Sequence, residues 1–207
     1  MGFYERWVLP RILDLVMRQK SLSEYRRRTV AGARGTVLEI GVGSGLNLPL
    51  YGREVTRVYG IDPSGELLAM ARRRARTAAF PVVLMQASAE ALPIDDRSID
   101  TAVMTWTLCS IPDPLRALGE LRRVMRPQGR LLFVEHGLAP EPGVQRWQHR
   151  LTPGWRRIGG GCHLDRKMDD LIRGAGFEFA DLGTGYMDGP KVLTFMYQGE
   201  ATRPGSY

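Results

Sequence analysis

The stretch VLEIGVGSGLNLPLY, residues 37–51, decides how this chain folds. It starts with an apolar run typical of a buried strand, and Gly41, Gly43 and Gly45 follow at every second position. A glycine-rich turn directly after a strand allows the backbone to approach a ligand closely, as in α/β nucleotide-binding proteins. We therefore expect a strand at 36–40, a ligand-binding loop behind it, and a helix that starts at Ser44.

Outward from this stretch, apolar runs alternate with helical patterns. An N-terminal helical region covers about 3–30, and helical patterns at 63–79 and 114–127 lie between apolar runs. The helix at 114–127 should bury one stripe, formed by Leu115, Leu118, Leu121, Val124 and Met125. Further strands are predicted at 55–62, 82–87, 99–106 and 130–136. Alternation of this kind builds a parallel sheet with helices on both faces.

The end of the chain departs from the alternation. The apolar runs at 177–183 and 191–198 are joined by a short Gly/Pro-containing link with no room for a helix, which predicts an antiparallel hairpin that closes the sheet. We find no boundary and expect one domain over 1–207, with a helical lid at 1–30, a cofactor-binding core at 36–136, and an acceptor-side segment with the hairpin at 137–207. The ligand should lie at the carboxyl ends of the strands.

Composition is that of an ordinary globular protein. The chain has 207 residues, 43% of them hydrophobic and 25% charged, which suits a single domain. It contains no apolar stretch long enough to span a bilayer and no signal-peptide pattern, so we expect a cytoplasmic location. Two cysteines, Cys109 and Cys162, cannot form a disulfide framework and should be reduced thiols.

The net charge of +7 favours anionic partners such as nucleic acid or a membrane surface. Arginines form clusters at 26–28, 72–74 and 122–123. Each cluster falls on a polar stretch of a predicted helix, where arginines are commonly solvated. No aromatic residues alternate with them, as a platform for stacking bases requires. Charge alone therefore does not predict nucleic-acid binding.

The glycine spacing separates two classes of cofactor. A dinucleotide fingerprint needs its third glycine at position 46, which is leucine; here Gly45 gives E-x-G-x-G-x-G, headed by Glu39. A carboxylate in this loop would repel a pyrophosphate, whereas S-adenosylmethionine has no phosphate and carries a positive sulfonium and amino group. Asp62 ends the second strand, where a carboxylate can accept hydrogen bonds from both ribose hydroxyls. The pattern therefore indicates S-adenosylmethionine.

Four stretches resemble the motifs of the class I S-adenosylmethionine-dependent methyltransferases: VLEIGVGSG, GIDPSGELLAMAR, QASAEALPIDDRSID and LRRVMRPQGRLLFVEH. The resemblance covers nearly the whole chain and implies a Rossmann-like α/β fold, with a mostly parallel seven-stranded sheet, a C-terminal antiparallel hairpin and helices on both faces. It places Ser88, Ala89 and Glu90 beside the adenine, and Thr105 and Trp106 on the methionine side, although Trp106 could equally be a core residue. The cofactor-binding residues expected are Glu39, Gly41, Gly43, Ser44, Gly45, Asn47, Asp62, Pro63, Ser64, Ser88, Ala89, Glu90, Thr105 and Trp106.

Within that family, three stretches resemble the alkyl-thiol S-methyltransferases and their small bacterial relatives: LCSIPDP (108–114), FVEHGLAP (133–140) and LTPGWRRIGGGCHLDRKMDDLIRGAGF (151–177). The chain differs from the mammalian members in starting with a charged amphipathic helix instead of an apolar membrane anchor. It also has Gly160 where the relatives often have an acid. The resemblance implies methyl transfer to a small, fairly apolar acceptor, with a thiol as one candidate.

Direct displacement at the methyl carbon needs alignment more than a strong catalytic residue. His136 follows the fifth strand at the carboxyl edge, and His163 lies with Asp165 in the segment that should cover the pocket, so both are candidates for a base. His149 lies on a helical stretch and should be structural. Cys162, His163 and a distant histidine could bind a metal, but no C-x-x-C or H-E-x-x-H spacing is present, so no metal is expected.

The N-terminal region repeats apolar residues at helical spacing, with Pro10 dividing or kinking the helix. It could pack on the sheet, form a lid over an apolar acceptor site, or contact lipid through a basic amphipathic surface. Two alternatives to a small acceptor therefore remain: a lipid or isoprenoid-quinone methyltransferase at the membrane surface, and an RNA-modifying or nucleic-acid-binding protein. A monomer or homodimer is expected. The repeated apolar residues are Phe3, Trp7, Val8, Ile12, Leu15 and Val16.

Overall fold

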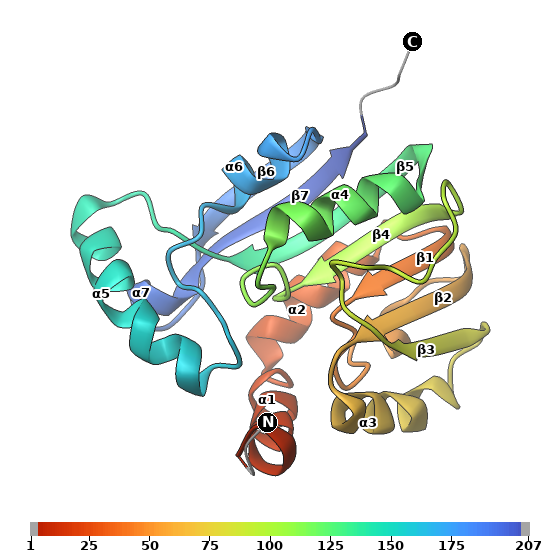
Figure 1. Cartoon of the computed structure of the whole chain (residues 1–207), viewed down its shortest axis with the longest axis horizontal. Helices are drawn as coiled ribbons and strands as arrows, with labels where there is room; N and C mark the ends of the chain where they lie inside the picture. The colour runs from red at the N-terminus through yellow and green to blue at the C-terminus, as the bar shows by residue number, and fades with distance from the viewer. Residues whose placement is uncertain (1–3, 204–207) are drawn as a thin grey trace.

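A computed structural model describes residues 4–203 of the chain and shows one seven-stranded sheet (Figure 1). The strand order is β3-β2-β1-β4-β5-β7-β6; the first five strands along the chain run parallel, and β7 runs antiparallel to both β5 and β6. The predicted mostly parallel sheet with a C-terminal antiparallel pair is confirmed. The strands are β1 (Gly35–Ile40), β2 (Val55–Asp62), β3 (Val82–Gln86), β4 (Ile99–Thr105), β5 (Met125–His136), β6 (Glu178–Tyr186) and β7 (Phe195–Thr202).

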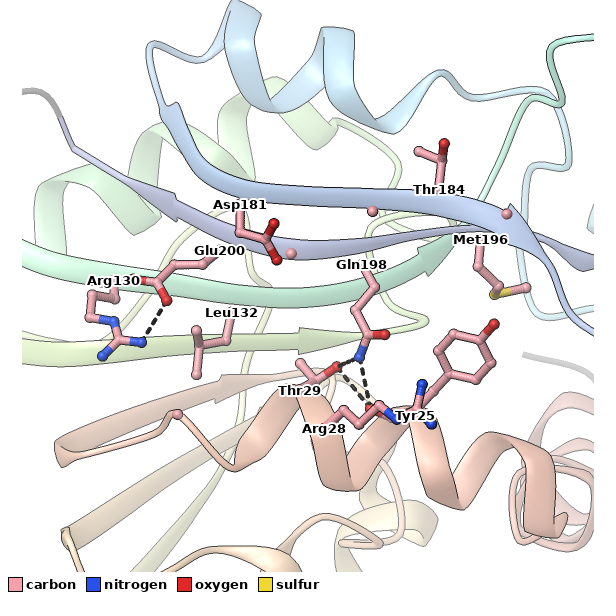
Figure 2. A pocket seen from close by; sticks show the side chains of 14 residues that line it. Tyr25, Arg28, Thr29, Arg130, Leu132, Asp181, Thr184, Met196, Gln198 and Glu200 are labelled. Carbon is pink, nitrogen blue, oxygen red and sulfur yellow. Dashed lines mark hydrogen bonds and ion pairs between the residues drawn. The ribbon is translucent and has the colours of Figure 1, made fainter.

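Helices cover both faces of this sheet. Helices α4 and α6 lie on one face and α2 lies against β5 and β7 on the other (Figures 1 and 2). A π-helical turn, η1 (Tyr4–Val8), precedes α1, and a 3₁₀ turn, η2 (Leu48–Leu50), follows the glycine loop. The α-helices are α1 (Leu9–Val16), α2 (Lys20–Val30), α3 (Gly65–Ala75), α4 (Pro114–Val124), α5 (Pro142–Ile158), α6 (Met168–Gly174) and α7 (Lys191–Thr194).

The core lies on both faces of the sheet because successive side chains of a strand point in opposite directions. In β1, Val37 packs with Val30 of α2, whereas Leu38 belongs to the cluster that contains Leu118 and Leu121 of α4. All four of these side chains are buried. Burial on both sides explains why the central strands β1 and β4 read as nearly continuous apolar runs.

Three local predictions were wrong. No α-helix starts at Ser44: residues 41–47 form turns before η2, because the three loop glycines take positive φ angles that a helix does not allow. The link in the C-terminal hairpin contains a short helix, α7, so the strand starts at Phe195 and not at Lys191. The third concerns the helix predicted at 114–127: Leu115 is exposed, because the buried residues of α4 begin at Ala117, and Met125 belongs to β5, which begins there and not at residue 130.

The apolar stripe predicted at the N-terminus does not pack on the sheet. Phe3 lies outside the described residues, but Trp7, Ile12, Leu15 and Val16 are exposed, with Leu15 at 71%. The buried residues of α1 are Leu9, Pro10 and Asp14. None of the helices within residues 4–203 is both long and apolar enough to cross a membrane.

Candidate active site

A cavity of about 1150 Å³ lies at the carboxyl ends of β1, β2 and β4. Helix α1 borders it on one side and the turn after α5 on another. The structure therefore gathers the segments that follow separate strands, as parallel strands require. Predicted residues that line the cavity are Gly41, Gly43, Ser44, Asp62, Pro63, Ser64, Ser88, Ala89, Thr105 and Trp106.

The glycine loop and the end of β2 are joined by Asp62. Its carboxylate accepts hydrogen bonds from the backbone N–H of Gly43 at 3.0 Å and of Ser64 at 2.8 Å. Burial raises the pKa of Asp62, and these two donors oppose that rise. Gly43 has φ +53, and a Cβ there would meet only the Gly41 carbonyl oxygen at 3.8 Å, so the loop presents bare backbone to the cavity.

A buried polar cluster supports the loop from below. Glu39 is 1% exposed and accepts hydrogen bonds from Asn47 Nδ2 at 2.9 Å and the Tyr51 hydroxyl at 2.8 Å. Burial raises the pKa of Glu39 to about 7, although Tyr51, Arg26 and Asn47 all oppose the rise. Because the Glu39 carboxylate binds Asn47 and Tyr51 inside the protein, it stabilises the conformation of the glycine loop.

Arg26 belongs to the same cluster and also lines the cavity. Its Nη1 donates to Asn47 Oδ1 and to Thr105 Oγ1, both at 3.1 Å, and its guanidinium lies over the Trp106 ring at 4.9 Å from the centroid. Only 6% of Arg26 is exposed, so the prediction of a solvated arginine cluster at 26–28 was wrong for this residue. Burial lowers the pKa of Arg26 to about 10, and Glu39 opposes that shift, so the guanidinium is charged at neutral pH.

Trp106 has an unusual backbone. Its φ is +54, a left-handed conformation that side-chain-bearing residues adopt rarely and at a cost of roughly 1–3 kcal/mol. Its N–H donates to the Val134 carbonyl at 2.8 Å, which fixes the turn at the end of β4. The strain lies where the chain leaves the sheet and enters the cavity wall.

The other walls of the cavity come from segments that do not belong to the sheet. Leu9, Leu13 and Met17 line it from the N-terminal region. Asp14 joins α1 to the core, because it accepts a hydrogen bond from Arg74 Nη2 at 3.0 Å while Arg74 Nη1 donates to the Ser44 carbonyl. Lining residues that were not among the predicted site residues include Arg26, Thr107, Ser110, Arg156, Gly159 and Gly161.

Six predicted residues, Glu39, Gly45, Asn47, Glu90, His136 and His163, are not among the described residues that line the cavity. Gly45 is at φ +81 and packs against α3, where a Cβ would lie 3.1 Å from the Ala71 Cα. Glu90 caps α4, as its carboxylate accepts from the Asp113 N–H at 2.7 Å. A role for Glu39, Gly45, Asn47 and Glu90 in cofactor binding stays a prediction.

The two candidate bases, His136 and His163, have different surroundings. His136 ends β5 and its Nε2 is 2.9 Å from Cys162 Sγ. His163 Nδ1 is 3.7 Å from Asp165 Oδ1; burial lowers its pKa, and Arg166 and Arg156 lower it further. His149 lies on α5, as predicted, and pairs with Asp165 at 3.0 Å. Catalysis by His136 or His163 stays a prediction.

A second cavity, of about 490 Å³, lies between α2 and strands β5, β6 and β7 (Figure 2). Its polar groups bind one another: Gln198 Nε2 donates to Thr29 Oγ1 at 2.7 Å and to the Tyr25 carbonyl at 3.0 Å, and Arg130 pairs with Glu200 at 2.5 Å (Figure 2). None of the predicted site residues lines it. The larger cavity is therefore the candidate active site.

Known proteins are similar to this chain in sequence and in fold. Residues 38–133 match the family described as a methyltransferase domain. Phosphatidylethanolamine N-methyltransferase of Cereibacter sphaeroides is 41% identical over 164 residues, which are 73% of this chain and 77% of that protein. Thiol S-methyltransferase TMT1B of Rattus norvegicus is 34% identical over 151 residues, which are 71% of this chain and 62% of that protein.

A solved structure agrees with these relatives. The crystal structure of a SAM-dependent methyltransferase from Thermotoga maritima has a TM-score of 0.70 with this chain and 27% identity, over 97% of this chain and 98% of that one. The strand order and the cavity at the glycine loop define a Rossmann-like α/β enzyme of the class I methyltransferase type. The chain belongs to the S-adenosylmethionine-dependent methyltransferases, and S-adenosylmethionine is its cofactor.

Proposed function

We propose that the enzyme transfers the methyl group of S-adenosylmethionine to a small, fairly apolar thiol. One observation carries the proposal: a single cavity joins the glycine loop, Asp62 and Ser88 to an apolar wall of Leu9, Leu13 and Met17. A polar nucleoside and an apolar acceptor therefore fit side by side. The thiol as acceptor is supported by the 34% identity to the rat thiol S-methyltransferase.

The residues present fit a phosphate-free nucleoside with a charged methionine part. The loop after β1 forms turns and a 3₁₀ helix, so it lacks the α-helix N-terminus that holds a pyrophosphate in dinucleotide sites. Asp62 would accept from the ribose hydroxyls, and Ser88 with Ala89 would flank the adenine. Arg26, buried beside Thr105 and Trp106, would pair with the methionine carboxylate.

The cofactor supplies the methyl group and its own leaving group, so the protein's share is alignment in a dry pocket. Residues 4–30 act as a lid in this proposal, with Leu9 and Leu13 excluding water from the acceptor. The Asp14–Arg74 hydrogen bond holds the lid to α3. Positioning of this kind can account for roughly 7–11 kcal/mol of a barrier. A thiol with a pKa of about 8.5 needs little help to lose its proton.

Release of S-adenosylhomocysteine tests the acceptor. Purified enzyme is mixed with S-adenosylmethionine and a panel of small thiols, with matched alcohols and amines of the same carbon skeleton as controls. We expect turnover with apolar thiols only, rising with pH as the thiolate fraction rises. Cofactor binding without turnover on any thiol would refute the thiol acceptor and leave the methyltransferase assignment unchanged.

A second candidate function is methylation of an amphipathic acceptor at a membrane surface. Exposed apolar residues favour it: Trp7, Ile12 and Leu15 in the N-terminal region, and Trp147 and Ile158 on α5. The basic net charge would add attraction to anionic lipid. The 41% identity to a phosphatidylethanolamine N-methyltransferase supports the same reading.

Sedimentation with vesicles separates the two candidates. If the acceptor lies in a membrane, the enzyme should pellet with vesicles containing anionic lipid. Leu15→Glu should lower the affinity for these vesicles by roughly tenfold or more, because the substitution places a charge at the lipid boundary. Leu115→Glu is a matched control, because Leu115 is also an exposed leucine but lies on α4. Wild-type enzyme that stays in solution with these vesicles would contradict this candidate.

A further inference from the structure

Cys109, His136 and Cys162 form a compact cluster next to the active-site cavity, which their chain neighbours Ser110 and Gly161 line. One ligand atom from each lies within 4.8 Å of the other two. Cys109 is 2% exposed and His136 8%, and Cys162 is partly buried. The cluster is thus nearly free of water, yet it consists of two thiols and an imidazole, the side chains that bind thiophilic metals.

The three residues come from separate segments that the structure fixes relative to one another. Glu135, next to His136, accepts hydrogen bonds from the backbone N–H groups of Leu108 at 2.9 Å and Cys109 at 3.4 Å. The His163 N–H donates to the Cys109 carbonyl at 2.9 Å, which ties the segment of Cys162 to the segment of Cys109. A preformed arrangement of this kind lowers the cost of assembling ligands around an ion.

Neither ring nitrogen of His136 binds a protein oxygen: Nε2 faces Cys162, and the buried Nδ1 has no hydrogen-bond partner among the described residues. Nε2 is therefore the nitrogen available to an ion in the cluster. The His136 Nε2–Cys162 Sγ distance is 2.9 Å, and a tetrahedral zinc ion would hold a nitrogen and a sulfur roughly 3.5 Å apart. This one separation would therefore have to widen by roughly 0.6 Å to admit the ion.

We propose that Cys109, Cys162 and His136 bind a zinc ion through two thiolates and one imidazole. Three protein ligands leave a fourth position open, as in catalytic rather than structural zinc sites. Ser110 and Gly161, which adjoin Cys109 and Cys162 in the chain, both line the active-site cavity. The cluster therefore adjoins the cavity wall, and in this proposal its open position faces the cavity. The metal site does not depend on which acceptor the enzyme uses.

Zinc content tests the site without cofactor or acceptor. Untagged enzyme is stripped with a chelator under a phosphine reductant, incubated with zinc, desalted and measured by elemental analysis. We expect about one zinc ion per chain, and at least a tenfold lower affinity for Cys109→Ser, Cys162→Ser and His136→Asn. His149→Asn is the matched control, since His149 lies on exposed α5 outside the cluster, and it should bind zinc like the wild type.

Cobalt substitution keeps the proposal testable if a variant fails to fold. Wild-type enzyme with cobalt should show a thiolate-to-metal charge-transfer band together with the visible absorption of tetrahedral cobalt. Wild-type enzyme that retains less than roughly a tenth of an equivalent of zinc would overturn the site, as would a cobalt complex without the charge-transfer band. Neither result would contradict the proposed methyl transfer to a thiol, because that reaction is measured in a separate experiment.

Discussion

Asp62→Ala is expected to weaken S-adenosylmethionine binding by at least about 100-fold. In our proposal the Asp62 carboxylate accepts hydrogen bonds from both ribose hydroxyls, and each bond to a charged group contributes about 1.5–3 kcal/mol. The substitution also removes the acceptor for the N–H groups of Gly43 and Ser64, so the glycine loop loses its link to β2. Isothermal calorimetry on the variant and the wild type measures the change.

Two further variants show whether the loss comes from the ribose. Asp62→Asn keeps one acceptor oxygen but no charge, so a smaller loss of about tenfold is expected. Asp95→Ala removes an exposed carboxylate from the link between β3 and β4 and should bind like the wild type. Unchanged affinity in a folded Asp62→Ala would show that the ribose lies elsewhere in the cavity.

The centre of the sheet could be predicted because β1 and β4 are buried on both faces and therefore read as apolar runs. The segment at 55–62 was placed with the bounds that β2 has in the structure, and the antiparallel pair followed from the short link between the last two runs. Strand order then brings the ends of β1, β2 and β4 together, so Gly41, Asp62 and Thr105 share one cavity as the motifs implied.

The role of Arg26 depends on long-range contacts, and for that reason it could not be identified from the sequence. Arg26 stands in a run of three arginines, and the local pattern does not show that the helix turns this one toward Thr105, 79 residues away. One signal was present: Arg26 follows Leu22 by one helical turn and precedes Val30 by another, so it belongs to the buried face of α2.

The cluster of Cys109, His136 and Cys162 could not be predicted from the sequence for a related reason. Cys109 and Cys162 are 53 residues apart, and His136 lies between them, so no metal-binding spacing appears along the chain. Only the folded protein brings the loop after β4, the end of β5 and the turn after α5 to one point. Spacing motifs detect sites built on one segment, whereas sites assembled at a sheet edge need the topology.

Arg26→Met should lower the free energy of unfolding by about 3 kcal/mol at about pH 8, because it removes the cation from a buried cluster that contains Glu39. The size of the loss should depend on pH. The pKa of Glu39 is about 7 in the folded protein, above its ordinary value of 4.5, so the folded state holds this proton more tightly than the unfolded state. Glu39 therefore favours folding most at low pH, and that contribution disappears as pH rises toward 7.

Without Arg26 the pKa of Glu39 rises further, so the stability of the variant keeps falling at pH values where the wild type has levelled off. At about pH 5.5 Glu39 is protonated in both folded proteins, and only the hydrogen bonds to Asn47 and Thr105 are lost, so the difference should be smaller. Urea unfolding at both pH values measures this. Arg28→Met, which breaks only a surface pair with Glu24, should change stability little at either pH. An equal loss for Arg26→Met at the two pH values would mean that Glu39 does not ionise beside Arg26, and the pairing within the buried cluster would be refuted.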